Sequence, residues 1–300
     1  MNQAIGAALR VLTLLIALPP LAFSRSAARL VARAAAKFGI ESARISHINL
    51  LRCFPDQSQE SVAALVRDSL CHTACLMAEA GMLAHWSRER IQRCVLSLEG
   101  IEPLRECLRR SQSVLLLVPH FGNWEMITFV LGGEGLVAVY DPPRISALEG
   151  PIKESRERFG ATLVPTDRAG LRAVYRALKH GGLIGILPDQ VPDTSAGVHA
   201  PFFGHPALTM TFAHRLIRQT SPAVFIGSAT RAKGGFHVRI VAAPAGVCDE
   251  DVSVHAASLN AAIEELVLTD PGQYQWEYKR FKRQPQDMEP VYPKVKANEI

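Results

Sequence analysis

The sequence predicts an α/β protein with a mixed, mostly parallel sheet flanked by helices. Short apolar runs of strand length alternate with longer segments whose apolar residues recur every three or four positions. The run 114–118 is aliphatic throughout, which is typical of a strand buried on both faces of a parallel sheet. Between residues 40 and 285 there is no Gly/Ser-rich linker and no repeat, so we expect one domain there.

The composition favours an anionic partner and a membrane. Lys and Arg number 33 against 28 Asp and Glu, a net charge of +5 that suits nucleic acid or a phospholipid surface. Hydrophobic residues make up 48%, and the mean hydropathy of +0.10 is high for a soluble enzyme. Six cysteines lack the spacing of a disulfide scaffold or a zinc site, which predicts reduced thiols facing the cytosol.

The N-terminal segment is a candidate membrane anchor. Residues 4–23 are apolar apart from Arg10 and Thr13, and they lack the basic start and cleavage site of a signal peptide. Pro19 and Pro20 limit the uninterrupted helix to about 15 residues, roughly 22 Å long. Spanning the hydrocarbon core takes roughly 20 residues. The segment therefore either spans with some strain or lies partly inserted.

A basic helix is expected directly after this anchor. Its cations recur every four residues along an alanine-rich sequence, so they form a stripe that can bind anionic head groups or simply face solvent. They are Arg25, Arg29, Arg33 and Lys37. Next to an apolar anchor we favour the membrane surface, and the positive-inside rule places the following domain on the cytoplasmic side.

The periodicity of the sequence predicts the elements of the main domain. A helix is expected to end before Pro55, and another is expected over 58–86. After the strand at 114–118, the expected strands are 136–140, 161–165, 183–187, 223–229 and 237–242. The expected helices are 146–159, 169–180, 209–218 and 252–268.

The turn after the aliphatic strand is the candidate active site. It reads His-Phe-Gly-Asn-Trp-Glu over residues 120–125, and ligands of α/β sheets bind at the carboxyl ends of strands. His120 can accept a proton from a hydroxyl if a carboxylate holds its other ring nitrogen, and we expect Glu125 to do so. The alternative is a polar histidine without a catalytic function, which is the commoner case for a lone histidine.

This hexapeptide resembles the signature of the late acyltransferases of lipid A biosynthesis, the lauroyl/myristoyl transferase family. That family is related to the glycerolipid acyltransferases, which carry His-x4-Asp. Further similarities follow in the family's order, at 49–55, 188–190, 197–204 and 273–283, so the resemblance covers about residues 10–285. It implies a glycerolipid-acyltransferase-like fold. We expect an anchor and basic helix at 1–40, an acyltransferase domain at 41–285 and a tail at 286–300.

The resemblance also suggests residues that bind substrate or stabilise an oxyanion. A basic residue near Arg158 has been placed close to the active site in the family, and Arg156 is the competing candidate. Asp189 could orient a basic group, could bind a substrate amine or hydroxyl, or could cap a turn. The backbone N–H groups around Gly122 and Asn123 are alternative oxyanion donors.

Aromatic residues further along the chain suggest lipid contacts. Phe202 and Phe203 suit the wall of an acyl-chain tunnel, although core packing explains them equally well. In the 273–283 segment, aromatics interleaved with cations could stack on RNA bases or lie at a membrane interface. No RNA-binding motif is present, so we expect three of its residues at the membrane surface, namely Trp276, Lys279 and Arg280.

Together these observations predict a membrane-associated acyltransferase. It would move a fatty acyl chain directly from acyl carrier protein or acyl-CoA to a hydroxyl of an anionic lipid, by resemblance a lipid A precursor. No metal, cofactor or nucleic-acid partner is expected. By resemblance, the enzyme would lie at the bacterial inner (cytoplasmic) membrane, with its catalytic domain facing the cytoplasm. The alternatives are a different lysolipid or aminolipid acceptor, a non-catalytic lipid-binding protein on this fold and, more distantly, a nucleic-acid-binding module.

Overall fold

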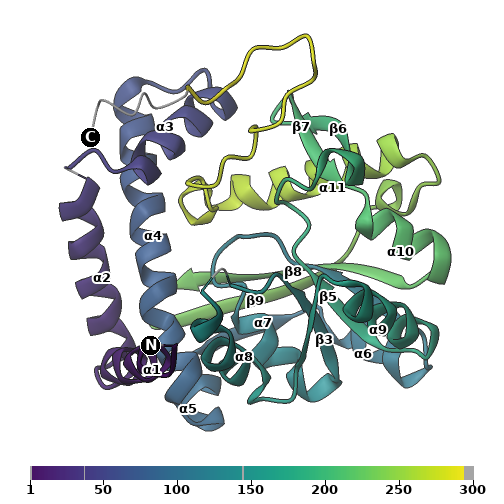
Figure 1. Ribbon diagram of the computed structural model, residues 1–300, viewed down its shortest axis with the longest axis horizontal. Coiled ribbons are helices and arrows are strands. Elements are labelled where there is room, and N and C mark those ends of the chain that lie inside the picture. Colours follow the sequence, from purple (N-terminus) through teal and green to yellow (C-terminus); the bar gives the residue numbers. More distant parts are fainter. Residues whose placement is uncertain (1, 37, 144, 294–300) are drawn as a thin grey trace.

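The computed structural model describes residues 2–36, 38–143 and 145–293, and Figure 1 shows their arrangement. Its helices are α1 (Asn2–Ala17), α2 (Leu21–Ala36), α3 (Glu41–Cys53), α4 (Gln59–His85), α5 (Arg88–Gln92), α6 (Ile101–Arg109), α7 (Met126–Leu131), α8 (Glu149–Glu157), α9 (Arg168–Lys179), α10 (Phe212–Thr220) and α11 (Val252–Thr269). Its strands are β1 (Val95–Glu99), β2 (Val114–Leu117), β3 (Leu136–Tyr140), β4 (Thr162–Pro165), β5 (Leu183–Ile186), β6 (Gly197–Phe202), β7 (His205–Met210), β8 (Ala223–Ala232) and β9 (Gly235–Ala242).

The centre of the protein is a seven-stranded sheet with the order β1-β9-β8-β2-β5-β3-β4. All neighbouring strands are parallel except the hairpin of β8 and β9. β2 lies between β5 and β8 and pairs with both along its whole length. The prediction of an α/β fold with a mixed, mostly parallel sheet is therefore confirmed.

The aliphatic run in β2 serves two hydrophobic cores. Successive side chains of a strand point to opposite faces. Leu115 and Leu117 accordingly join the core under α9, α10 and α11, whereas Val114 and Leu116 join the core with α6 and α7. A fully buried leucine contributes about 1.5–3 kcal/mol. A strand covered on both sides has no position left for a polar residue, which explains the unbroken run.

Several local predictions differ from the structure, and the hairpin of β6 and β7 and the short helices α5, α6 and α7 were not predicted. The helix expected from residue 209 begins only at Phe212, because Thr209 and Met210 complete the separate two-stranded hairpin of β6 and β7. β1 was not predicted at all. Its residues Leu96 and Leu98 are exposed, so the strand has no clear alternation of apolar-in and polar-out positions.

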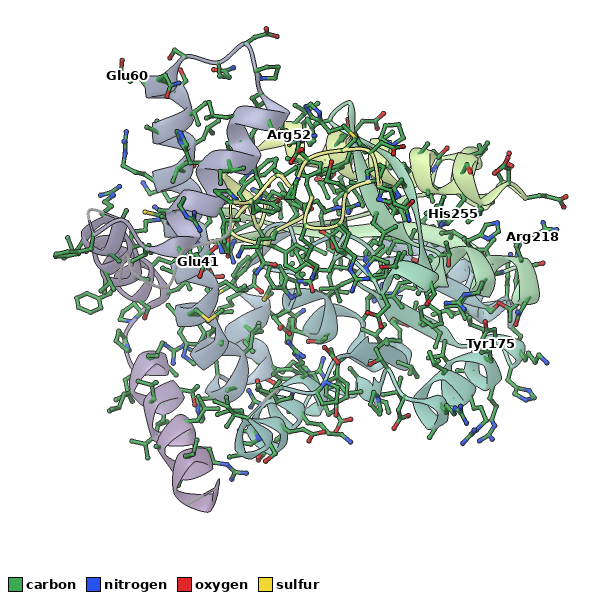
Figure 2. The ribbon with its side chains drawn as sticks, turned by 45° about the horizontal axis from the view of Figure 1, so that its top comes forward. Glu41, Arg52, Glu60, Tyr175, Arg218 and His255 are labelled. Carbon is green, nitrogen blue, oxygen red and sulfur yellow. The ribbon has the colours of Figure 1, made fainter. Side chains whose placement is uncertain are left out.

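The helices α1 and α2 lie against α4 and are bent by 114° at the break between them. No single helix among the described residues is long and apolar enough to cross a membrane, but the bent pair together meets that length and composition. Trp86 at the end of α4 donates its indole N–H to the carbonyl of Ala17, 2.7 Å away. The helices α1, α2 and α4 form one side of the molecule, and α9 and α10 lie on the other (Figures 1 and 2).

Arg25 does not belong to the expected membrane-facing stripe. Its side chain turns inward, with only 7% of the residue exposed, and its Nε donates to Glu79 at 2.7 Å. Arg29 is half-buried, whereas Arg33 is exposed as expected. Lys37 lies outside the described residues. The four-residue spacing cannot show which cation of a helix faces a buried carboxylate. In this structure that cation is Arg25.

The C-terminal aromatic and basic cluster is also largely internal. Trp276 is 1% exposed and donates its indole N–H to Pro271 O. Arg280 is buried and donates to the carbonyl of Leu208, and Lys279 pairs with Glu41 at 2.8 Å. The prediction of a membrane surface is therefore wrong for Trp276 and Arg280. The side chains of this segment fill the space between the helices and the sheet instead of facing outward.

We expect Arg25→Ala to lower the free energy of unfolding by about 3–5 kcal/mol, because removing one partner leaves a buried charge under-compensated. The matched variant Arg33→Ala removes an exposed cation of the same helix and should change stability by no more than about 0.5 kcal/mol. Urea unfolding followed by tryptophan fluorescence measures both. Equal stability of the two variants would place Arg25 at the surface.

Candidate active site

The turn that follows β2 is held by the backbone on both sides. Phe121 forms an isolated bridge with Tyr274, and Gly122 forms one with Ala229. Gly122 has a φ of +60°, and a Cβ on it would lie 2.2 Å from the carbonyl oxygen of Ala229. Only glycine fits this position without displacing β8. The residue before this clamp, His120, is thus fixed at the carboxyl end of the central strand.

His120 is paired with Asp189, which follows the neighbouring strand β5. The ring Nδ1 lies 2.7 Å from Asp189 Oδ1, and the backbone N–H of His120 donates to Oδ2 at 2.8 Å. Asp189 is 2% exposed. β2 and β5 are parallel neighbours, so residues just past their ends meet at the same edge of the sheet. Of the predicted functions of Asp189, orienting a basic group is the one this geometry matches.

The electrostatics of the pair fix the tautomer of the imidazole. Burial acts to raise the pKa of Asp189, but the charge of the His120 ring when it is protonated and the two hydrogen bonds from His120 outweigh burial and hold that pKa below its ordinary value. An ionised carboxylate can only accept, so Nδ1 of His120 carries the proton and Nε2 has a free lone pair. The Gln190 amide nitrogen lies 3.1 Å from this Nε2 and donates to it.

Glu125 does not orient His120, contrary to the sequence prediction. It directly precedes α7 and forms a two-point ion pair with Arg156 of α8, in which Arg156 Nε donates to Oε2 at 2.7 Å. Burial acts to lower the pKa of Arg156, but Glu125 outweighs it and raises that pKa. The ring of Trp124 lies edge-on to the imidazole at a centroid distance of 4.8 Å.

The chain matches the model of the bacterial lipid A biosynthesis acyltransferases over residues 4–283. It belongs to that family. It is 26% identical to a lipid A biosynthesis acyltransferase of Haemophilus influenzae, over 85% of this chain and 82% of that protein. It is 25% identical to the lipid A biosynthesis lauroyltransferase of Escherichia coli, over 86% of this chain and 85% of that protein. The palmitoleoyltransferase of the same organism is 26% identical, over 80% and 79%. The family supports acyl transfer to lipid A, and the protein is an acyltransferase.

Arg158 of this acyltransferase is bonded to the end of α4 and has no hydrogen bond to the His120 turn among the described residues. Its Nη1 donates to the carbonyls of Leu83 and Trp86, at 2.9 and 2.8 Å, and so satisfies the C-terminal end of α4. Its guanidinium lies over the ring of Phe159. The prediction that Arg158 binds substrate or an oxyanion is therefore wrong, and the competing candidate Arg156 is the arginine beside the motif.

The backbone N–H groups proposed for an oxyanion are already engaged. Gly122 N–H donates to Gln273 O at 2.9 Å, and Asn123 N–H donates to Ala229 O at 2.8 Å. Both bonds belong to the clamp that holds the turn, so releasing either would loosen it. Gly122 and Asn123 thus position the turn in the acyltransferase, and the prediction that they donate to an oxyanion is wrong.

Phe202 and Phe203 belong to an aromatic cluster around the end of β6. Phe202 is fully buried, and its ring packs near those of Tyr274 and Phe281. Phe203 is half-buried and contacts Phe54. Residues that line an open tunnel present a face to it, whereas every side of Phe202 is covered. Core packing, the second of the two explanations the sequence allowed, is the one the structure supports for Phe202.

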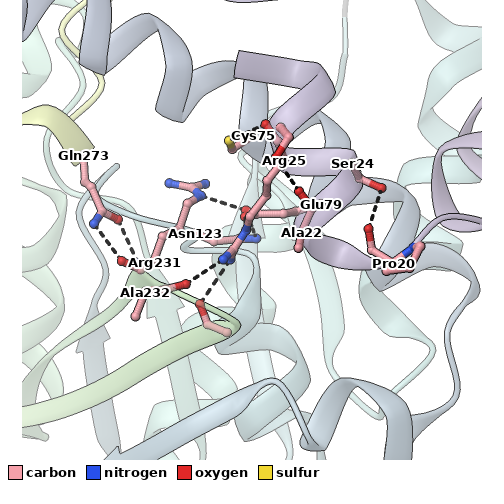
Figure 3. A network of polar contacts seen from close by, with 12 residues as sticks. Pro20, Ala22, Ser24, Arg25, Cys75, Glu79, Asn123, Arg231, Ala232 and Gln273 are labelled. Carbon is pink, nitrogen blue, oxygen red and sulfur yellow. Dashed lines mark hydrogen bonds and ion pairs between the residues drawn. The ribbon is translucent and has the colours of Figure 1, made fainter. Parts of the chain in front are cut away.

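A buried carboxylate that the sequence analysis did not find joins the His120 turn to two helices (Figure 3). Glu79 of α4 is 0% exposed. One of its oxygens accepts from Arg25 Nε at 2.7 Å. The other accepts from Asn123 Nδ2 and Arg231 Nε, each at 2.8 Å. The available signal was an acidic residue on the apolar face of the 58–86 helix, one turn from Cys75.

A small cavity lies between α4 and the His120 turn. Its lining includes His72, Gly122, Trp124, Arg231 and Tyr274, and its volume of about 10 Å³ is near that needed for one water molecule. Arg231 Nη2 and His72 Nδ1 have no hydrogen-bond partner within the described chain. Burial, helped by Arg231, lowers the pKa of His72 to about 3, so this imidazole is neutral at physiological pH.

We expect His72 to make the stability of the acyltransferase depend on pH. Below its ordinary pKa of 6.5 the unfolded chain binds a proton that the folded chain does not bind until about pH 3. The contribution of the neutral His72 side chain to the free energy of unfolding is therefore fully present above pH 6.5. It is lost at up to about 1.4 kcal/mol per pH unit as the pH falls. Between pH 7 and 5 the wild type should lose about 2 kcal/mol more than His72→Gln in guanidinium unfolding. Parallel losses in the two proteins would contradict the low pKa.

Proposed function

We propose that this acyltransferase moves a fatty acyl chain from an acyl thioester to a hydroxyl of a lipid A precursor. His120 is the general base in this proposal, and Asp189 is its orienting partner. The observation that carries the proposal is the short contact between His120 Nδ1 and Asp189 Oδ1 at the carboxyl end of β2. Membership of the family supports the lipid A acceptor.

The proposed reaction is a direct transfer with one proton relay. His120 Nε2 takes the proton of the acceptor hydroxyl while the hydroxyl oxygen attacks the thioester carbonyl carbon. Asp189 stabilises the imidazolium that forms. When the tetrahedral intermediate collapses, the C–S bond breaks and the imidazolium returns the proton to the leaving thiolate. The products are an ester and a free thiol, so atoms and charge balance without an acyl-enzyme.

We assign the oxyanion to a side-chain donor, because the two backbone donors expected for it, Gly122 and Asn123, are engaged. Gln190 directs its amide N–H at Nε2 of His120 in the resting site. The acceptor hydroxyl needs that same lone pair, so it displaces the amide and leaves its N–H free beside the reacting carbonyl. Arg156, held by Glu125, keeps the start of α7 against α8 and so supports the turn in this scheme.

We further propose that the enzyme works at the cytoplasmic face of the bacterial inner membrane, with α1 and α2 as its attachment. Large apolar side chains on the outer side of these helices and at the break between them are more than half exposed, and with Arg33 they suit the lipid interface. These side chains are Val11, Leu12, Leu15, Leu18, Phe23, Leu30 and Val31. The acyl donor is acyl carrier protein in this proposal, with acyl-CoA as the alternative.

Mass spectrometry of the membrane lipids from cells with and without the gene tests the proposed reaction. We expect the lipid A of gene-containing cells to carry one additional acyl group, whose mass identifies the chain. Purified protein should transfer the same group from its thioester to a lipid A precursor. A lipid A profile that does not change, with a different lysolipid gaining the acyl group, would contradict the proposed acceptor.

We expect His120→Ala to lower kcat by about 10²–10⁴-fold, the usual contribution of a general base. Asp189→Ala should cost a similar or smaller factor. The double variant should be little worse than His120→Ala, because the two residues act as one unit. Circular dichroism checks that each variant is folded. A folded His120→Ala protein with near-normal kcat, or factors that multiply in the double variant, would contradict the pair.

The assignment of Gln190 predicts a different kinetic pattern. Gln190→Leu keeps most of the side-chain volume but removes the donor, so kcat should fall by about 10²–10³-fold with little change in the KM of either substrate. If the amide only blocks the base, the same variant should turn over faster than the wild type. Steady-state kinetics with both substrates varied distinguish the two outcomes.

A further inference from the structure

The helices α9 and α10 form an outward face that carries cations and no acids. Neither helix contains an Asp or a Glu. All six cations of this face are exposed, and one of them, Arg218, is paired with an acid. The other five are Arg168, Arg172, Arg176, Lys179 and Arg215. We call these six residues the α9–α10 basic face.

The cations of α9 form a stripe on the side opposite to its buried face. At 3.6 residues per turn, the four lie within about 80° of one another and extend over about 17 Å. The inward side is occupied by Gly170, Val174 and Leu178, which pack on the sheet. These four cations face solvent, and none of them has a carboxylate partner among the described residues.

The basic face is almost unpaired within the described part of the chain. Among its ion pairs, only Arg218 has a carboxylate partner, Glu250 at 2.7 Å. The nearest acid in sequence, Asp167, caps the N-terminus of α9 by accepting from Gly170 N–H. Like charges spaced four residues apart on a helix destabilise it. By contrast, the cations of α6 have Glu102 and Glu106 beside them.

The face begins at the same edge of the sheet as the proposed site. α9 starts directly after the carboxyl end of β4, and His120 follows the carboxyl end of β2. The strand order places β4 three strands from β2, which is about 14 Å. A partner bound at the start of α9 therefore needs a flexible arm of about 14 Å or more to deliver a group to His120.

A membrane is a poor match for this face. The densest group of exposed large apolar residues lies on α1 and α2, at the opposite side of the molecule from α9 and α10 (Figure 1). Figure 2 shows Tyr175 of α9 and Arg218 of α10 on this far side as well. One flat bilayer that contacts α1 and α2 cannot also contact α9 and α10. A small anionic thioester would contact only one or two cations of a stripe of this length, so it does not account for the whole basic face.

We propose that the α9–α10 basic face docks an acidic carrier protein that bears the acyl thioester. This inference rests on the proposed function and names the surface on which its carrier-bound donor docks. The positive face would steer the acidic carrier and speed encounter more than it changes the chemical step. It therefore predicts an effect on kcat/KM for the carrier-bound donor alone.

The test is the double charge reversal Arg172→Glu/Arg176→Glu, compared with Lys233→Glu/Arg239→Glu. The control changes the net charge equally at exposed positions of β9 and the turn before it, outside the basic face. Each enzyme is assayed with the acyl group on acyl carrier protein and on uncharged N-acetylcysteamine. We expect the first variant to lose at least about tenfold in kcat/KM with the carrier and less than twofold with N-acetylcysteamine. The control should match the wild type.

Binding of acyl carrier protein, measured by calorimetry at low and high salt, tests docking separately from catalysis. The wild type and the control variant should bind acyl carrier protein at low salt and release it at high salt. The charge-reversal variant should bind it weakly at both salt concentrations. Equal binding by reversal and wild type would overturn the docking surface even if the enzyme is active. If the charge reversal abolished binding of an RNA oligonucleotide but left binding of acyl carrier protein unchanged, the proposed docking surface would also be overturned. An inactive wild type that still shows charge-dependent carrier binding would contradict the proposed reaction but support docking.

Discussion

The parallel register of β2 and β5 is the constraint on which the site depends. Leu117 pairs with Ile186 across the two strands, and the chain continues for three residues from each to reach His120 and Asp189. Equal offsets from paired positions bring the two side chains face to face without a long loop. The register is set by a sheet buried on both sides, where a shift of one residue would turn every side chain toward the wrong core.

The buried ions around Glu79 secure the other side of the same turn. Two arginines and Asn123 share this carboxylate, so helix α2, helix α4, strand β8 and the His120 turn meet at one fully buried point. Buried ion pairs contribute little net stability, since desolvation offsets much of their attraction. However, a buried ion pair is tolerated only if its partners are closely and correctly positioned, so it constrains the elements that carry them. We therefore regard this network as fixing how the N-terminal helices sit against the turn.

The arginines of this chain have several distinct environments that the net charge of +5 does not reveal. Arg25, Arg231 and Arg280 are internal and bind carboxylates, amides or carbonyls. Arg158 closes the end of a helix, and Arg156 holds Glu125. Only those on surfaces such as the α9–α10 basic face are available to partners. A guanidinium offers several donors and stays charged when buried, which suits it to every one of these positions.

The sequence by itself determined the α/β class, the central strand, most helices and the place of His120, because these follow from local periodicity and from the motif. It also supplied Asp189 as a strand-end residue, but it paired His120 with the nearer Glu125. Only the tertiary structure decided that pairing, the inward turn of Arg25 and the burial of Trp276 and Arg280. These outcomes depend on contacts between residues up to about 230 positions apart in the chain, such as Asn49 with Trp276. Local spacing carries no information on which distant group a polar side chain will find when water is excluded.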